Sequence, residues 1–290
     1  MKRFFKVAGH CFALDIPEGH PLWKRCSQYA PFHVKECDDP VFSLSLVEDL
    51  PWDGLKMVYD GSPEPGQPLV RLFKGEGCWG AESAPLRNAP VAGRLLMSND
   101  FREGKLMLTG DNDALFALNN ALMLLFAFST AGMGTLEMHA SVTVNSGKAF
   151  LFLAKSGTGK STHSQLWLDN IPGSSLLNDD NPVVRLWPDG RVIVYGSPWS
   201  GKTPCYKNEE YPAGAFVQIR RSPENKISRL SLFESYALLY GSSSGFKADR
   251  TMADGLHETF SAIAQKCPCY VLDCRPDADA ARVCSEEVLG

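Results

Sequence analysis

Hydrophobic and polar positions follow two different patterns along this chain. Up to about residue 105 the apolar residues form short runs separated by turns, which predicts strands at residues 4–14, 42–46, 69–73 and 105–108. Residues 61–66, Gly-Ser-Pro-Glu-Pro-Gly, predict a loop. From about residue 111 helical and strand patterns follow one another. We therefore expect a smaller β-rich N-terminal lobe over residues 1–110 and a core with helices and strands over residues 111–290.

The most apolar stretch of the chain spans residues 114–131. Leu115, Leu118 and Leu122 recur at helical spacing. Asn119 and Asn120 interrupt the stretch, which makes it too polar for a membrane span. The pattern predicts a long core helix and no membrane contact.

Two strands are predicted next, at residues 138–144 and 149–153. The four residues between them read Asn-Ser-Gly-Lys, and so short a turn joins neighbouring strands as an antiparallel hairpin. Since simple parallel nucleotide-binding folds do not usually build this strand as the second arm of a hairpin, the core sheet is expected to be mixed.

Directly behind this hairpin, residues 154–161 read Ala-Lys-Ser-Gly-Thr-Gly-Lys-Ser. They fit the phosphate-binding pattern G-x-x-x-x-G-K-[ST], with Ala154 at its first position. Gly157 and Gly159 permit positive φ, so that backbone N–H groups can surround a phosphate at the start of a helix near Lys160. Lys160 is expected on the terminal phosphates and Ser161 on Mg²⁺. The predicted nucleotide-binding residues are Ser156, Gly157, Thr158, Gly159, Lys160, Ser161 and Thr162.

An acidic pair, Asp179-Asp180, ends the next apolar run, at residues 174–178. A strand that ends in aspartate beyond a phosphate loop is where a Mg²⁺-binding carboxylate is expected. One carboxylate would hold the metal and the other would take a proton from an attacking hydroxyl, in an order that the sequence leaves open. The alternative is a solvated turn, because Asn-Asp-Asp-Asn-Pro has strong turn chemistry.

Further candidates carry positive or neutral polar groups. His139, on the first arm of the hairpin, could contact a phosphate or the metal, although a lone histidine on an apolar strand is often a core residue. Lys202, in the loop 196–202, could neutralise the transferring phosphoryl group, or that loop is an ordinary surface loop. Three arginines could clamp a phosphate or an acceptor, and each could equally be solvated: Arg220, Arg221 and Arg250.

The net charge and the cysteine content of the chain limit the binding partners and the cellular location that we expect for it. The net charge of −4 gives no general electrostatic case for nucleic acid. No secretory leader is recognised, and the nine cysteines are expected to be reduced in a cytoplasmic protein. Cys267-Pro-Cys269 has the wrong spacing for a zinc site, and residues 269–274 predict a buried strand instead.

Together His139-Ala140, the loop 154–161 and Asp179-Asp180 resemble the HPr kinase/phosphorylase family, whose core is shared with ATP-dependent phosphoenolpyruvate carboxykinase. The resemblance is strong over about residues 135–205. It implies an α/β (α+β) fold with a mixed-sheet P-loop core, and a Mg²⁺-dependent kinase that transfers a phosphoryl group from ATP to a hydroxyl. That hydroxyl would be a serine of a peptide or protein, or belong to a small molecule. In this picture His139 supports the phosphoryl site.

The resemblance has limits. The N-terminal lobe differs from that of the bacterial HPr kinases, the stretch that contacts HPr is not found, and the chain is too short for a carboxykinase. ADP or pyrophosphate remain open as donors, and a homo-oligomer is an open expectation. The rival functions are a nucleotide-binding regulator or slow ATPase without an acceptor, and an interaction scaffold that only retains the fold.

Overall fold

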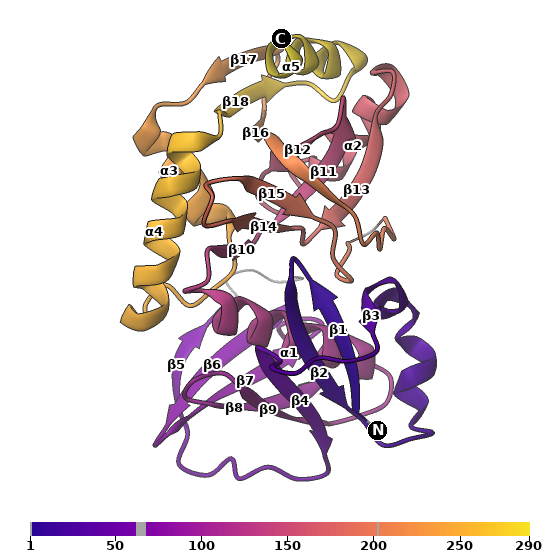
Figure 1. Cartoon of the computed structure of the whole chain (residues 1–290), viewed down its shortest axis with the longest axis vertical. Coiled ribbons are helices and arrows are strands. Elements are labelled where there is room, and N and C mark those ends of the chain that lie inside the picture. The colour runs from indigo at the N-terminus through magenta and orange to yellow at the C-terminus, as the bar shows by residue number, and fades with distance from the viewer. Residues whose placement is uncertain (1, 62–67, 202) are drawn as a thin grey trace. The chain divides into compact units, whose positions relative to one another are not determined.

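The computed structural model describes residues 2–61, 68–201 and 203–290 (Figure 1). It forms two compact units, Met1–Ser129 and Thr130–Gly290, which are described separately here. The division falls at the end of helix α1 (Ala114–Thr130), whereas the sequence placed the boundary before that helix, at residue 110. The helix belongs with the first unit because Ala117 and Leu125 face the strand glycines Gly93 and Gly104 closely.

The first unit is built on one nine-stranded mixed sheet in the order β3-β1-β2-β4-β9-β8-β7-β6-β5. β2 pairs parallel with β4, and β4 parallel with β9, while the other pairs are antiparallel. The strands are β1 (Lys2–Val7), β2 (His10–Asp15), β3 (His33–Val34), β4 (Phe42–Val47), β5 (Lys56–Asp60), β6 (Leu69–Gly75), β7 (Cys78–Ala84), β8 (Gly93–Ser98) and β9 (Glu103–Leu108), with short 3₁₀ helices at Pro21–Arg25 and Ser27–Phe32.

Most predicted elements of this unit are present. The strands predicted at residues 42–46, 69–73 and 105–108 are confirmed as β4, β6 and β9, and the predicted helix is α1. The stretch 4–14 is two strands and not one, because Ala8 and Gly9 both take positive φ and turn the chain back. Residues 62–67 of the predicted loop lie outside the described residues.

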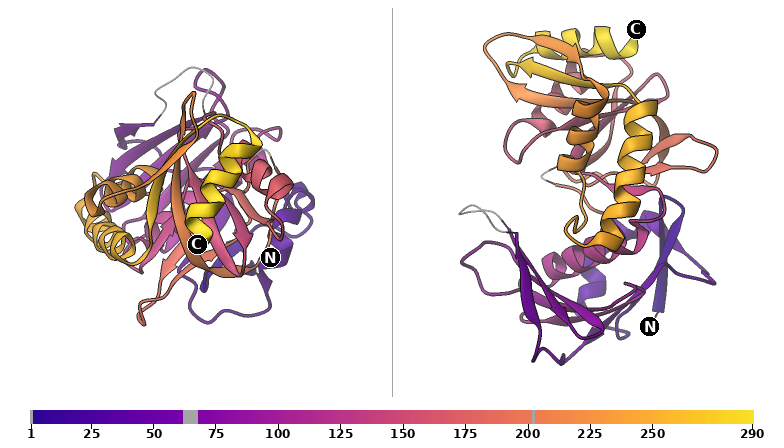
Figure 2. Two further views of the ribbon diagram at one scale, coloured as in Figure 1. Left: turned by 90° about the horizontal axis from the view of Figure 1, so that it is seen from above. Right: turned by 90° about the vertical axis from the view of Figure 1, so that its left-hand side faces the viewer.

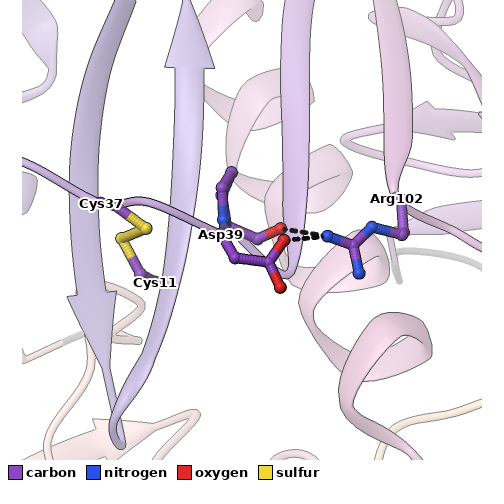
Figure 3. The surroundings of a disulfide bond; sticks show 5 residues. Cys11, Cys37, Asp39 and Arg102 are labelled. Atoms are coloured by element: carbon purple, nitrogen blue, oxygen red, sulfur yellow. Dashed lines mark hydrogen bonds and ion pairs between the residues drawn. A yellow bond between two sulfur atoms is a disulfide. The ribbon is translucent and has the colours of Figure 1, made fainter.

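A disulfide joins Cys11 of β2 to Cys37 in the segment after β3 (Figure 3). Close by, Arg102 forms an ion pair with Asp39 and donates to the carbonyl of Pro40 at 3.3 Å. The expectation that all nine cysteines are reduced is therefore wrong for this pair, because the fold brings together two cysteines 26 positions apart. The remaining seven are free thiols.

The second unit holds another mixed sheet, in the order β10-β14-β15-β16-β12-β11-β13, with β18 against β16 and β17. Its elements are β10 (Thr135–Glu137), β11 (Ala140–Asn145), β12 (Lys148–Leu153), α2 (Lys160–Asn170), β13 (Ser175–Asp180), β14 (Val183–Leu186), β15 (Val192–Tyr195), β16 (Glu210–Arg221), β17 (Lys226–Arg229), α3 (Leu232–Ser242), α4 (Arg250–Lys266), β18 (Cys269–Cys274) and α5 (Ala278–Leu289).

The predicted hairpin and mixed sheet are both confirmed in this unit. β11 and β12 pair antiparallel, while β12 pairs parallel with β16, and β16 parallel with β18. The first strand begins later than predicted, so His139 precedes β11 and lies between β10 and β11. The predicted buried strand at residues 269–274 is β18.

Helices α2 and α5 close one core of the second unit. Phe150 and Phe152 of β12 contact Trp167 of α2, with ring centroids 5.3 Å apart in both pairs. Ala280 and Cys284 of α5 belong to the same buried cluster, and burial raises the pKa of the Cys284 thiol. Helices α3 and α4 pack side by side elsewhere on the unit (Figure 2). No helix of the described residues is long and apolar enough to span a membrane.

Candidate active site

The glycine loop, residues 154–159, connects β12 to α2. Gly157 and Gly159 have φ values of +75° and +131°, a region that residues with a Cβ rarely adopt. A Cβ on either glycine would meet nothing within 4 Å, so the backbone conformation, and not lack of space, requires glycine. Helix α2 begins at Lys160, and no side chain caps its first amides. Uncapped amides at a helix start suit an anion.

The hydroxyl groups predicted to face a nucleotide surround this loop. Ser156, Ser161 and Thr162 are exposed, and Thr158 is half-buried. The Thr158 amide donates to the carbonyl of Lys155 at 3.1 Å, which closes the turn. The structure thus places these residues together at the start of α2.

A chain of three polar side chains runs across the ends of the central strands. Lys160 Nζ lies 2.7 Å from His139 Nε2 and 3.3 Å from the carbonyl oxygen of Ala154. On the other side of the ring, His139 Nδ1 lies 3.0 Å from Asp180 Oδ1. One tautomer satisfies both contacts: Nδ1–H donates to Asp180 and Nε2 accepts from Lys160. Three residues that the sequence singled out separately are thus brought together.

The surroundings of Asp180 and Lys160 lower the pKa of both side chains. Burial raises the pKa of Asp180, but the hydrogen bond from His139, the charge of Lys160 and the hydrogen bond from Asn181 lower it further than burial raises it. Burial lowers the pKa of Lys160, and the charges of Asp180 and Asp179 only partly offset this. Asp180 is therefore an ionised carboxylate at neutral pH, with His139 on one oxygen and the Asn181 amide on the other, at 3.0 Å each.

The backbone of Asp180 is strained. Its φ is +148°, a region that is nearly restricted to glycine and costs about 1–3 kcal/mol for other residues. The residue pairs with Ala140 of β11 and forms a bridge with Ser200, so neighbours on both sides hold it in place. Strain of this kind is characteristic of functional sites.

Asp179 has different partners from Asp180. It is 2% exposed, and its Oδ2 accepts from the Thr203 amide at 3.2 Å. Its carbonyl accepts from the Ser200 hydroxyl at 3.2 Å and from the Gly201 amide. The two carboxylates of the predicted pair therefore face different surroundings, as consecutive strand residues do. Lys202, in the same loop, lies outside the described residues.

Asn178 is a site residue that sequence reasoning missed. Its fully buried amide donates to Ser197 Oγ at 3.2 Å and to the Trp199 carbonyl at 3.1 Å. Its Oδ1 accepts from the Asn181 amide at 3.0 Å. Asn178 thereby fixes the loop after β15 against the end of β13. The available signal was an amide side chain within an apolar run directly before two aspartates.

Glu137 is a second missed residue, two positions before His139. It is 2% exposed, and its Oε1 accepts from the Ser244 hydroxyl at 3.5 Å. Oε2 is buried and has no hydrogen-bond partner within the described ranges. Burial, with the charge of Asp180, raises the pKa of Glu137 to about 8. The signal here was an acid inside the apolar run Leu136-Glu137-Met138.

Of the three candidate arginines, one reaches the glycine loop. Arg221 donates to the carbonyls of Thr158, at 3.1 Å, and Gly157. Arg220 donates to Gln218 Oε1 at 2.9 Å, and Arg250 lies 4.0 Å from Asp254 on an exposed helix face. Arg221 therefore braces the loop from the end of β16.

A cavity of about 370 Å³ lies beside the glycine loop, bounded by α2 and the ends of β16 and β18. Leu166 and Ile219 give it apolar walls, and Arg221 and Arg275 lie at its polar side. His163 lines it as well, and burial lowers the pKa of this ring to about 4, so the ring is neutral at pH 7. The cavity has the size and lining of a small-molecule site.

The donors present suit a metal that arrives with phosphate. Within the described part of the chain, no three His, Cys, Asp or Glu side chains are placed to hold a metal ion together. Mg²⁺ usually keeps several waters and takes one or two carboxylates plus phosphate oxygens. The exposed Ser161 hydroxyl and one of the two carboxylates could supply protein oxygens in that manner.

Comparison with known proteins shows a distant similarity to solved structures. No family model matches the chain, and no curated protein matches it. Among solved structures, it is similar to the HPr(Ser) kinase/phosphatase from Coxiella burnetii, at 11% identity over 53% of this chain and 96% of the other, with a TM-score of 0.31. The relation in fold is distant.

Proposed function

We propose that the second unit binds a nucleoside triphosphate with Mg²⁺ and transfers its terminal phosphoryl group to a hydroxyl of serine type, in a peptide, a protein or a small molecule. The observation that carries this proposal is the line Asp180–His139–Lys160 beside the uncapped start of α2. This arrangement brings a cation, a carboxylate and the uncapped backbone amides of α2 together, and these are the groups that phosphoryl transfer requires.

Lys160 has the central binding role in this proposal. In the structure its ammonium rests on His139 and on the Ala154 carbonyl. It would exchange these partners for the terminal phosphate oxygens, while the loop amides and the start of α2 hold the other phosphates. The Ser161 hydroxyl, together with waters, would hold Mg²⁺, which when bound neutralises charge on the phosphate oxygens.

Asp180 is the better placed of the two carboxylates to receive the proton of the attacking hydroxyl. Its side chain is 35% exposed and rests on His139, whereas Asp179 is nearly inaccessible and accepts from the Thr203 amide. We assign Asp180 to the acceptor hydroxyl, with His139 as the group that orients it. Asp180 is ionised at neutral pH, so positioning matters more than base strength.

The cavity beside the loop supports a nucleotide donor over pyrophosphate. It adjoins Gly157 and Gly159, and its apolar walls and neutral His163 suit a nucleoside, which pyrophosphate lacks, while Arg221 and Arg275 remain available to an anionic group. ATP is the donor that we propose, and a comparison with ADP and pyrophosphate tests that choice.

The test is thermal melting with Mg²⁺ and ATP, ADP or pyrophosphate, on the wild type, Lys160→Ala and a control lysine variant, Lys148→Ala. Lys148 is exposed at the start of β12. A ligand at 100 times its Kd stabilises the native state by about 2.7 kcal/mol, so we expect a shift with ATP that Lys160→Ala loses and Lys148→Ala keeps. An equal shift in Lys160→Ala would remove this site from consideration. Binding followed by phosphate release without transfer to any seryl peptide would favour a slow ATPase.

A further inference from the structure

The first unit contains a hollow of about 700 Å³ beside β1 and β3. It is lined by residues 2–5 and 33–35, and by Trp23, Cys26, Ser27 and Ala30. Consecutive residues of a strand point to opposite faces of the sheet. A hollow that four consecutive residues of β1 line must therefore run along the edge of that strand, and not over one face.

The edge of β1 is only partly covered. On one side β2 pairs with all six residues of β1, from Lys2 to Val7. On the other side β3 pairs only with Phe4 and Phe5. Within the described ranges no strand pairs with Lys2 and Arg3 on that side. An uncovered strand edge offers backbone N–H and C=O groups to an added strand.

The lining is positively charged. Its titratable side chains include Lys2, Arg3, His33 and Lys35, and no aspartate or glutamate of the described residues lines it. In the β1–β2 register Lys2 lies opposite Asp15, whereas Arg3 lies opposite Leu14. On a chain with a net charge of −4, this is a local positive site that attracts an anionic partner.

Three aromatic side chains line the hollow: Phe4, Phe5 and Trp23. Phe5 is 3% exposed, and Lys2 Nζ lies 5.9 Å from the centroid of the Phe4 ring. The Arg3 guanidinium carbon lies 3.9 Å from the centroid of the Trp23 ring, so that ring face is occupied. Single-stranded nucleic acids bind largely by stacking bases on open aromatic faces. The arrangement therefore favours a ligand that uses backbone hydrogen bonds and carboxylates.

We propose that this hollow binds an extended acidic peptide segment, which adds a strand along the free edge of β1 beyond β3 and places carboxylates against Arg3 and Lys35. Strand addition of this type gives affinity through main-chain hydrogen bonds and specificity through side-chain pockets. The proposal concerns the first unit alone and holds whether or not the second unit transfers phosphoryl groups.

The test uses the full chain and fluorescent peptides of about ten residues, read by anisotropy at about 50 mM salt, where charge contacts are weakly screened. The probe alternates Glu and Thr. Two controls alternate Lys and Thr, or Glu and Pro, the latter with half of its N–H donors removed. The test variant is the double charge reversal Arg3→Glu plus Lys35→Glu. The control variant is Lys6→Glu, because Lys6 is an exposed residue of β1 outside the lining.

We expect the Glu-Thr peptide to bind and the double reversal to weaken it about tenfold or more, while Lys6→Glu changes affinity less than about twofold. Equal binding of the Glu-Pro peptide would overturn strand addition. Equal binding of the Lys-Thr peptide, or tighter binding of a thymidine oligonucleotide, would overturn the acidic peptide as ligand. No detectable binding of the Glu-Thr peptide by wild type, with a melting curve that shows both units folded, would overturn the site.

Discussion

Replacement of Glu137 by glutamine tests the electrostatics of the candidate site most directly. The side chain is buried with one oxygen unpartnered, and burial and the charge of Asp180 raise its pKa from 4.5 to about 8. Glutamine has nearly the same shape but carries no titrating proton. Glu137→Gln should therefore keep the fold and change how stability depends on pH.

The direction in which pH changes the stability of the wild type follows from the raised pKa of Glu137. Between pH 4.5 and 8 the folded protein keeps a proton that the unfolded chain has released. The corresponding stability is complete below the unfolded pKa and is lost as pH rises toward the folded pKa, at about 1.4 kcal/mol per pH unit. From about pH 5 to about pH 7, the wild type should lose about 3 kcal/mol relative to Glu137→Gln. The other titrating groups are common to both proteins, so their effects largely cancel in the difference.

The assay is urea-dependent hydrogen exchange of peptides covering β10 and β14, which reports on the second unit alone, measured with a chelator present. Glu258→Gln, on an exposed position of α4, is the control and should follow the wild type. If the stability difference between wild type and Glu137→Gln stayed within about 0.5 kcal/mol over this range, Glu137 would not be a protonated buried acid and the reasoning would be refuted.

Three further changes test particular interactions. The unfolding free energy of Asp180→Gly should be about 1 kcal/mol higher than that of Asp180→Ala, since only glycine adopts φ near +148° without strain. An equal or lower unfolding free energy would exclude backbone strain at this position. Asn178→Ala should cost about 2–4 kcal/mol of unfolding free energy because it leaves buried partners unsatisfied; a loss no larger than that of Asn170→Ala, an exposed control on α2, would contradict this. Reduction of the Cys11–Cys37 disulfide should lower the unfolding free energy of the first unit by about 3 kcal/mol, given its sequence separation of 26. If the denaturant midpoint of this unit were the same with and without reductant, the cross-link would be refuted.

Local patterns in the sequence predicted the centre of the second unit well. The four-residue turn between two apolar runs fixed an antiparallel hairpin, and the mixed sheet followed from it. The glycine positions predicted positive φ at Gly157 and Gly159, and the start of α2 at Lys160. Such features depend on neighbouring residues, so the sequence suffices for them.

Features that depend on distant residues could not be predicted in the same way. The role of Asn178 depends on Ser197 and Trp199, some twenty positions away. The burial of Glu137 depends in part on Ser244, from the segment after α3. The disulfide required knowledge that the segment after β3 returns to β2. In each case a tertiary contact, absent from any local pattern, sets the environment of the side chain.

The arrangement of β11, β12 and β13 has a consequence for the order of folding. His139, the glycine loop and Asp180 are held by three adjacent strands whose pairings close short stretches of chain. The pairing of β16 with β12 and β18 closes moderately longer loops, as Ala149 with Ala213 and Phe216 with Cys269 against Ala140 with Asp180, which costs slightly more chain entropy before any contact is gained. The polar centre thus belongs to the part of the sheet that can form first, and the strands that complete the sheet dock onto a geometry already set.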